Sequence, residues 1–464
     1  MTKTAFLIAA STSGSGKTTI ARGLMALLTM KGLRVQPFKC GPDYIDTKFH
    51  EAVCHRPSIN LDTFMASPQH VRELFARYGA DADVCIVEGM MGLFDGYDRE
   101  RGSSAEIAQV LGLPVVLVVD AKAAAYSTAA LLSGFIHFRE GVRISGVIFN
   151  RVGSERHYKM LQQVCQDLSL RCLGYLPKNA ELEQGSRYLG LDFSEHAPIG
   201  MLTQLLEQHV DWQQLSAPFS FPQAPSDLPQ LGEAPPSAPE GDTIAPALHD
   251  KTIEAPSGAV GGASSPQLGG LRGAVGLRGA VVARNAESFS FLYQETLDGF
   301  ARVSFFDPEK EVPQLEGCDL LYLPGGYPEK HLEALVGNEA ARQAIRDYAE
   351  RGGRVVAECG GMMYLCREIV SDEGSYPMCG VLPYSISARR ADRRLSLGYR
   401  QFTLDGRSYR GHEFHYTQFL EPIPPSACQV FNALGEPVPT PVFRLKNVLA
   451  SYTHLYPNYE ADIY

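Results

Sequence analysis

The chain has 464 residues, of which 45% are hydrophobic and 20% charged, and its formal net charge is -10. This length exceeds what one hydrophobic core usually supports, so at least two domains are expected in a protein of ordinary globular composition. The negative charge argues against broad binding to nucleic acid or to an acidic membrane surface.

Two apolar stretches resemble targeting or membrane segments. Residues 1–10 form a short apolar run that leads directly into a glycine-rich turn, which argues against a signal peptide. Residues 111–136 are interrupted by Asp120 and Lys122, so a strand followed by a helix is expected there rather than a membrane span. The ten cysteines show no CxxC pair, which favours a reducing, cytoplasmic location.

The first region, residues 1–212, alternates between apolar strands and helical patterns. A helix is expected over residues 17–32, and strands are expected at residues 4–10, 33–39, 83–89, 114–120 and 144–150. Such alternation predicts an α/β domain in which helices cover both faces of a parallel sheet.

The composition changes after residue 212. Residues 213–276 are rich in Pro, Gly, Ala and Ser, which predicts a linker without a packed core. Residues 277–464 return to alternation, with strands expected at residues 278–284, 302–307, 320–326 and 354–360, then shorter β segments that end near residue 458. The sequence therefore predicts a second α/β domain.

A glycine-rich turn, AASTSGSGKTTIARG, follows the first strand and opens the first helix. Backbone N–H groups in such a turn hold phosphate oxygens, a lysine reaches the outer phosphates and a threonine hydroxyl binds Mg²⁺. The strict phosphate-loop pattern requires glycine where this chain has Ser11, and partition-type ATPases carry a second lysine where it has Thr12. The predicted nucleotide contacts are Ser13, Gly14, Ser15, Gly16, Lys17, Thr18 and Thr19.

Carboxylates follow the next strands at the edge where ligands bind in such sheets. Asp43 and Asp46 come after the second strand, and Glu88 ends the third. Acids that face a phosphate loop commonly hold Mg²⁺, although Asp43 and Asp46 could instead form the turn and cap a helix. Asn150 ends a later strand and could contact a nucleotide base or serve only as a turn residue. His50 and His55 lack zinc-type spacing.

Cys359 lies at a strand-turn-helix junction in RVVAECGGMMYL. The helix dipole at this position is expected to favour the thiolate, which is the nucleophilic form of cysteine. The N–H groups of Gly360 and of Gly326, in the turn LYLPGGYPE, could stabilise an oxyanion.

A nucleophilic cysteine also needs a base. The sequence offers His454 near the C-terminus and two competitors in RGHEFHY, His412 and His415, and spacing alone does not choose among them.

Eight motifs occur in the order typical of the cobyrinic acid a,c-diamide synthases of corrinoid biosynthesis: SGSGKTT, KCGPDYID, VEGMMGLFDG, LPGGYPE, ECGGMMYL, LGYR, GHEFHY and NVLASYTHLY. The chain closely resembles this family over nearly its whole length apart from the linker. The resemblance implies a dethiobiotin-synthetase-like phosphate-loop domain joined to a class I glutamine amidotransferase domain.

The resemblance also implies an activity. ATP would phosphorylate the a and c carboxylates of the corrin ring, and ammonia from glutamine would displace phosphate to leave amides. Cys359 matches the nucleophile that forms a thioester with glutamine, His454 matches its base, and Gly326 and Gly360 match the oxyanion positions.

The remaining matches concern ATP and Mg²⁺. Lys17 matches a phosphate contact and Asn150 an adenine contact. Asp43 matches an acid of the amidation site, where Thr18, Asp46 and Glu88 would also hold Mg²⁺. The implied partners are a corrinoid ring, glutamine and ATP, without nucleic acid or membrane, and a homodimer is left open.

The chain departs from the family in two places. Class I domains carry Glu two residues after the histidine, where this chain has Tyr456, and the linker is longer than usual. A cluster of Arg389, Arg390, Arg393 and Arg394 could clamp substrate carboxylates, although a solvated loop is favoured.

Alternative functions remain at this point. The same chemistry could act on hydrogenobyrinic acid or nickel sirohydrochlorin, which the motifs do not separate. A nucleotide-switch partition-type ATPase is disfavoured by Thr12, and a dethiobiotin-type ligase would leave Cys359 and His454 without a role. Ring metal, order of amidation and oligomeric state are not determined by the sequence.

Overall fold

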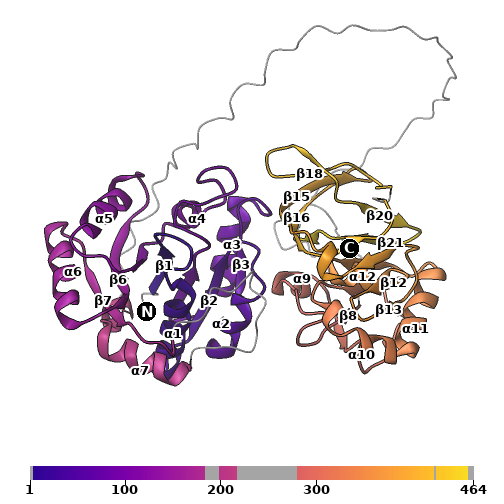
Figure 1. Ribbon diagram of the computed structural model, residues 1–464, viewed down its shortest axis with the longest axis horizontal. Helices are drawn as coiled ribbons and strands as arrows, with labels where there is room; N and C mark the ends of the chain where they lie inside the picture. Colours follow the sequence, from indigo (N-terminus) through magenta and orange to yellow (C-terminus); the bar gives the residue numbers. More distant parts are fainter. Residues whose placement is uncertain (1–3, 183–197, 217–278, 423–424, 458–464) are drawn as a thin grey trace, which may run out of the picture. The chain divides into compact units, whose positions relative to one another are not determined.

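The computed structural model describes residues 4–182, 198–216, 279–422 and 425–457 (Figure 1). The segments on either side of the expected linker belong to one compact unit, formed by residues 1–219 and 274–464. Of the expected linker, residues 213–216 lie in a short helix and the rest falls outside the described residues. The domain boundaries stay predictions.

A parallel sheet organises the first region, with strand order β3-β2-β4-β1-β5-β6-β7. All the strands expected in this region are present, and the sheet has two further edge strands. One of these has only three residues, which is too short for a sequence pattern to reveal. The strands are β1 (Thr4–Ala10), β2 (Val35–Cys40), β3 (Ile59–Leu61), β4 (Val84–Glu88), β5 (Val115–Asp120), β6 (Ile144–Val152) and β7 (Cys172–Pro177).

Helices cover both faces of this sheet, because successive strand residues point to opposite sides. Phe6 and Ile8 of β1 pack in one core with α1 and α7, whereas Leu7 packs in another with α3, α4 and α6. The helices are α1 (Lys17–Met30), α2 (Asp46–Cys54), α3 (Pro68–Tyr78), α4 (Ser104–Leu111), α5 (Thr128–His137), α6 (Glu155–Asp167), α7 (Ile199–His209) and α8 (Trp212–Ser216).

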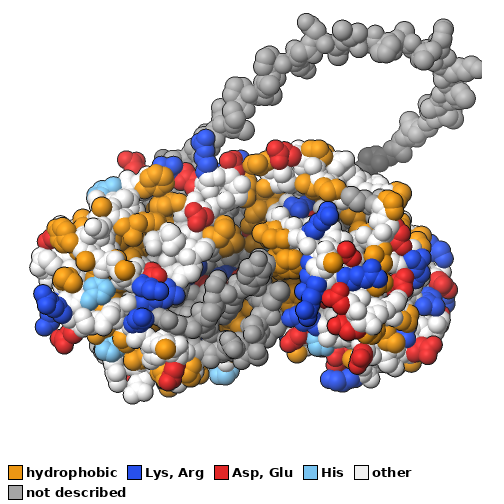
Figure 2. Space-filling view, in the orientation of Figure 1, with side chains coloured by type: hydrophobic (Ala, Val, Ile, Leu, Met, Phe, Trp, Pro, Cys, Tyr) orange, Lys and Arg blue, Asp and Glu red, His pale blue; other side chains and the backbone are white. Residues whose placement is uncertain are grey.

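The apolar stretch 111–136 forms β5 and α5, as expected. Among the described helices, none has the length and apolar character needed to cross a bilayer. On the face shown in Figure 2, Lys and Arg side chains of the described residues are interspersed with Asp and Glu.

The second region contains a sheet ordered β20-β21-β11-β10-β8-β9, parallel except where β20 pairs with β21. Its strands are β8 (Ala280–Ala283), β9 (Val303–Phe306), β10 (Leu320–Leu323), β11 (Val355–Glu358), β20 (Val442–Leu445) and β21 (Val448–Ser451). The helices are α9 (Gln294–Asp298), η1 (Pro328–Lys330), α10 (Leu332–Gly337), α11 (Glu339–Glu350), α12 (Gly360–Leu365) and η2 (Arg390–Asp392). The expected α/β class is therefore confirmed for both regions.

Two smaller sheets complete the second region, ordered β13-β12-β14-β17 and β19-β18-β15-β16-β22. The strands of the first are β12 (Glu368–Val370), β13 (Ser375–Pro377), β14 (Ser385–Ser387) and β17 (Gln418–Phe419). The strands of the second are β15 (Ser396–Leu404), β16 (Arg407–His415), β18 (Val430–Phe431), β19 (Pro437–Val438) and β22 (His454–Leu455).

One hydrophobic core contains side chains from both regions. Phe291, Tyr293, Tyr399 and Tyr456 belong to the same buried cluster as Leu7 of β1. The second region therefore packs against the face of the first sheet that also carries α3 and α4.

Candidate active sites

The glycine-rich turn has the backbone that a phosphate loop requires. Gly14 and Gly16 have φ of 78° and 92°, a region that side chains rarely adopt. Asn150 Nδ2 donates to the Ser15 carbonyl at 2.9 Å, and a Cβ on Gly16 would come within 2.0 Å of the same nitrogen. Asn150 thus braces the loop, and its expected contact with adenine stays a prediction.

Three oxygen-bearing side chains meet beside this loop. The Thr18 hydroxyl donates to Glu88 Oε1 at 2.6 Å and lies 3.3 Å from Asp46 Oδ2. Lys39 Nζ donates to both acids, at 2.6 Å to Asp46 and 3.0 Å to Glu88. His50 Nε2 is 2.6 Å from the other oxygen of the fully buried Glu88.

Lys39 and His50 compensate these buried acids electrostatically. Burial opposes the charge of Lys39, but Asp46 and Glu88 outweigh it and raise the pKa of the ammonium. Burial likewise opposes ionisation of Glu88, but Lys39 and His50 bring the pKa of that carboxyl well below its usual range. Burial raises the pKa of Asp46, to which Asp43 and Glu88 add.

The Thr18 hydroxyl and the Asp46 and Glu88 carboxylates are hard oxygen donors that fit Mg²⁺. No group of three or more His, Cys, Asp and Glu side chains converges as a metal cage within the described parts of the chain. The fit is therefore that of a partial ligand set, with phosphate oxygens and water for the remaining positions.

Two other predicted residues lie nearby. Lys17 Nζ donates to the Met91 carbonyl at 3.1 Å, and burial lowers the pKa of this lysine. Asp43 Oδ1 accepts the N–H groups of Ile45 and Asp46, each at 2.8 Å, so Asp43 does form the turn before α2.

Cys359 lies between β11 and α12 with φ 46° and ψ -108°. A positive φ in a non-glycine residue is a strained conformation that is typical of functional positions. The side chain is 3% exposed, and burial raises the pKa of its thiol. Burial therefore opposes the thiolate that the helix dipole is expected to favour.

The two glycines predicted as oxyanion donors lie together beside this cysteine. A Cβ built on Gly360 would meet the Gly326 backbone oxygen at 2.9 Å and its nitrogen at 3.0 Å. The neighbouring Gly325 faces His454, since its Cβ would lie 2.1 Å from the Cε1 atom of that ring. The Gly325–Gly326 turn therefore connects the surroundings of Cys359 with His454.

His454 is 1% exposed, and burial lowers its pKa to about 3, so its imidazole is neutral. Neither ring nitrogen has a hydrogen-bond partner among the described residues. The rings of Tyr44 and Phe291 lie 5.2 and 5.8 Å from it, centroid to centroid. A neutral imidazole with free nitrogens can accept a proton from a thiol.

The competing histidines differ from His454. His415 bonds to Glu413 at 2.7 Å and to the Thr417 carbonyl at 2.9 Å, so both of its nitrogens are engaged. His412 pairs with His454 across β16 and β22, and burial lowers its pKa to about 4. The geometry disfavours His415 as the base and leaves His454 adjacent to the Gly325–Gly326 turn.

A cavity of about 280 Å³ lies beside Asp43, His412 and His454. It is lined from the first region by Pro42, Asp43, Tyr44, Ile45 and Met90, and from the second by Phe291, Tyr327, Leu397, His412, Phe414 and His454. The acid-bearing turn and the histidine therefore face one largely apolar space.

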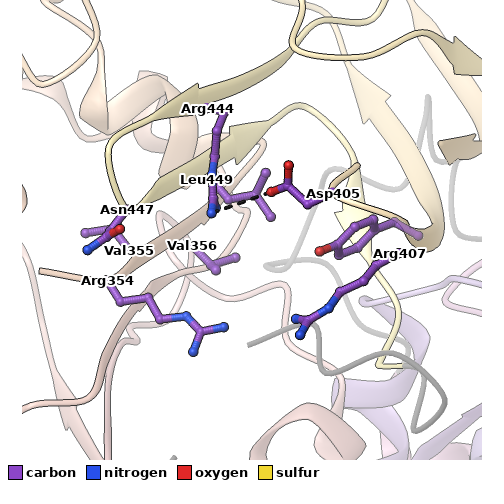
Figure 3. A pocket seen from close by; sticks show the side chains of 9 residues that line it. Arg354, Val355, Val356, Asp405, Arg407, Arg444, Asn447 and Leu449 are labelled. Carbon is purple, nitrogen blue, oxygen red and sulfur yellow. Dashed lines mark ion pairs between the residues drawn. The ribbon is translucent and has the colours of Figure 1, made fainter. Parts of the chain in front are cut away.

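Another cavity, of about 460 Å³, lies where β11 and β21 begin, at the opposite end of these strands from Cys359 (Figure 3). Arg354 and Asn447 line it just before β11 and β21, whereas Cys359 follows β11. Arg444 forms an ion pair with Asp405 there at 3.7 Å. The cavity is lined by neither Cys nor His side chains and is separate from the site around Cys359.

The predicted arginine cluster is exposed and lies around η2. Arg390 is 3.7 Å from Asp372. This placement agrees with a solvated loop, and a role in binding substrate carboxylates stays untested.

Comparison with known proteins assigns both regions. The model of the CobQ/CobB/MinD/ParA nucleotide binding domain matches residues 6–189, and that of the CobB/CobQ-like glutamine amidotransferase domain matches residues 287–460. Cobyrinate a,c-diamide synthase of Caldanaerobacter subterraneus subsp. tengcongensis is 36% identical over 97% of this chain and 94% of its own length. The chain belongs to the cobyrinate and hydrogenobyrinate a,c-diamide synthase family.

Two further members show the same relation. Hydrogenobyrinate a,c-diamide synthase of Streptomyces coelicolor is 36% identical over 89% of this chain and 86% of its own. Cobyrinate a,c-diamide synthase of Listeria monocytogenes is 37% identical over 89% of this chain and 87% of its own. Among solved structures, chloroplast FtsY from Physcomitrella patens matches 37% of the chain at 18% identity and a TM-score of 0.29, too little to support any inference.

The sequence motifs predicted the candidate catalytic and metal-binding residues but not the residues that contact and position them. Lys39, His50 and Gly325 were not assigned to the sites. A lysine at the end of a buried strand, FKC, was the one available signal for Lys39.

Proposed function

We propose that this protein amidates the a and c carboxylates of cobyrinic acid, using ATP and glutamine. The observation that supports this proposal is the cavity that Asp43 and His454 share. Cobyrinate and hydrogenobyrinate synthases are equally similar to the chain at 36% identity, so the metal-free ring is the alternative substrate.

On the nucleotide side, the proposed first step forms an acyl phosphate. A ring carboxylate oxygen attacks the terminal phosphorus of ATP, and ADP leaves. Lys17 would neutralise charge on the transferring phosphoryl group. Mg²⁺, held by Thr18, Asp46 and Glu88, would supply further positive charge at the phosphates when bound.

On the glutamine side, the sulfur of Cys359 attacks the side-chain amide carbon. His454 takes the thiol proton and passes it to the departing ammonia, and the N–H groups of Gly326 and Gly360 stabilise the oxyanion. Water then hydrolyses the thioester to glutamate. Because both Cys359 and His454 are neutral in the buried site, we expect proton transfer to accompany attack rather than precede it.

We assign the shared cavity as the passage for ammonia. Its mostly apolar lining, which includes Ile45, Met90 and Phe414, would disfavour protonation of ammonia to ammonium. Ammonia then attacks the acyl phosphate carbon and phosphate leaves, which yields the amide.

The test is mass spectrometry of cobyrinic acid incubated with the protein, Mg²⁺, ATP and isotopically labelled ammonia. Two labelled amides per ring support the proposal. No labelled product from cobyrinic acid, but two amides on hydrogenobyrinic acid, would reassign the ring; no product from either would refute the proposal.

Cys359→Ala provides a further prediction. We expect it to abolish glutamine-dependent amidation while amidation from free ammonia stays within about twofold of wild type, because only the thioester step needs sulfur. Loss of both activities in a folded variant would contradict the role given to Cys359. Lys17→Ala is expected to remove both.

The finer assignments belong to the same proposal. We expect a ligase that forms C–N bonds with glutamine as amido donor and works in the cytoplasm. A homodimer and the absence of nucleic-acid and membrane partners stay expectations.

A further inference from the structure

Tyr456 stands two residues after His454, and its side chain is fully buried at 1% exposure. Its hydroxyl donates to Glu295 Oε2 of α9 at 2.7 Å, and the Asn60 carbonyl lies 3.4 Å away. Its backbone N–H donates to the Arg410 carbonyl at 2.9 Å, which extends the pairing of β22 with β16. Residues i and i+2 of an extended strand share a face, so fixing Tyr456 also fixes the face that carries His454.

Glu295 connects this strand to the nucleotide-binding region. It is 2% exposed, and its Oε1 is hydrogen-bonded to His70 Nε2 of α3. The Glu295 carboxylate thus links Tyr456, which lies two residues after the proposed base His454, to helix α3 of the nucleotide-binding region. A buried carboxylate with two such partners is costly to disturb, since either loss leaves an uncompensated oxygen.

The acid-bearing turn touches the same cluster. The Tyr44 ring lies 4.7 Å from Tyr293 and 5.2 Å from His454, and Tyr293 lies 5.0 Å from Tyr456. Tyr44 follows Asp43 directly in the chain. The histidine is therefore supported by aromatic side chains of both regions.

We propose that Tyr456, Glu295 and the partly exposed His70 form a hydrogen-bonded relay that positions the His454 strand against α3, so that glutamine hydrolysis depends on the docked arrangement of the two regions. The inference rests on the proposed function. Class I domains carry an acid two residues after the histidine, and here Tyr456 occupies that position. Its hydroxyl anchors the strand to the nucleotide-binding region through Glu295.

The relay is tested with His70→Ala, because His70 lies in the nucleotide-binding region and away from the glutamine site. Glutamate release and ring amidation are measured with glutamine or with ammonia. We expect kcat for glutamine hydrolysis to fall about tenfold, as for loss of a hydrogen bond to a charged group, with KM for glutamine within about twofold of wild type. Ammonia-dependent amidation stays within about twofold.

Tyr456→Phe gives a second route to the same readout, since it removes only the hydroxyl and keeps the ring. We expect the same fall in kcat for glutamine hydrolysis. The matched control is Tyr78→Phe, which deletes another hydroxyl bond between α3 and α9, to Asp298, without involving the His454 strand. Its kcat is expected to stay within about twofold of wild type.

Three outcomes would overturn the relay: wild-type kcat in His70→Ala, an equal loss in Tyr78→Phe, or a loss in His70→Ala without one in Tyr456→Phe. If wild-type protein releases no glutamate and amidates neither ring with either nitrogen source, the proposed function fails and the relay with it.

Discussion

At the scale of single residues, the position of the His454 ring requires a glycine at position 325. Gly325 follows β10, and a Cβ on it would meet the imidazole at 2.1 Å from Cε1 and 2.8 Å from Nδ1. The turn at residues 325–326 therefore leaves room for the His454 ring. The sequence motif LPGGYPE contains this requirement, but only the packing shows which glycine faces the histidine.

Gly325→Ala is expected to lower glutamine-dependent amidation by about 100-fold or more, because a displacement of about 1 Å at a catalytic group costs that much. Ammonia-dependent amidation should persist. Steady-state assays with both nitrogen sources measure the difference. The control is Gly337→Ala in the same region, where an added Cβ has no neighbour within 4 Å; a similar loss in that control would contradict the steric argument.

Glu358 predicts a pH dependence of stability. It is 2% exposed, accepts the Tyr322 hydroxyl at 2.9 Å, and burial raises its pKa to about 8. The folded protein therefore holds this proton up to pH near 8, whereas the unfolded chain loses it near the usual glutamate pKa of 4.5, so stability falls as pH rises through this window.

Glu358→Gln is expected to remove that dependence, which amounts to at most about 1.4 kcal/mol per pH unit. Urea unfolding at pH 6 and pH 8 compares the two proteins. The wild type should lose more stability than the variant over this interval, and the exposed Glu350→Gln should keep the wild-type slope. Equal slopes in wild type and Glu358→Gln would show that the carboxyl is ionised in the fold.

At the scale of elements, the carboxyl ends of β2 and β4 and the start of α1 and α2 meet around one buried ammonium. Parallel neighbours in the sheet, β2 and β4, place Lys39 directly opposite Glu88. The first residue of α2 is Asp46, and Thr18 lies in the first turn of α1. Lys39 thus holds the two acids together.

Lys39→Met is expected to destabilise the fold by about 3–5 kcal/mol, because it leaves Asp46 and Glu88 buried without their shared cation. Urea unfolding measures this loss, and amidation with either nitrogen source should fall as well. Lys31→Met breaks the more exposed ion pair with Glu207 and should cost about 1 kcal/mol or less. A Lys39→Met protein as stable as wild type would contradict the network.

At the scale of the whole molecule, side chains of both regions line one cavity. The segments that line it are more than 350 residues apart in the chain at their extremes, Pro42 and His454. Tyr399 also bonds to Asp62 Oδ2 at 2.6 Å, so a strand of the second region is held to the first beside the cavity.

Leu397→Trp tests the passage, since Leu397 lines the cavity and is 52% exposed. We expect glutamate release to continue while amide formed per glutamate falls about tenfold, because the larger side chain obstructs ammonia transfer. The control is Leu395→Trp, at a neighbouring position that is 45% exposed and outside the lining. Unchanged stoichiometry in Leu397→Trp would place the passage elsewhere.

Local sequence patterns were sufficient to predict the central strands and most of the candidate site residues of this protein. Hydrophobic alternation predicted the central strands, and short motifs at strand-turn-helix junctions predicted Lys17, Thr18 and Cys359 as site residues. His454 was preferred to His412 and His415 only through the family resemblance. Short edge strands such as β3 were not predicted, because three residues are too few to show a hydrophobic alternation.

The residues that surround those groups become apparent only from the packing of the folded chain. Lys39 meets Asp46 and Glu88, Gly325 meets His454, and Tyr456 meets Glu295 because segments far apart in sequence pack together. Burial also raises the pKa of the Cys359 thiol, which opposes the thiolate expected from its place at the start of a helix. Such effects depend on three-dimensional neighbours, which no local pattern of residues specifies.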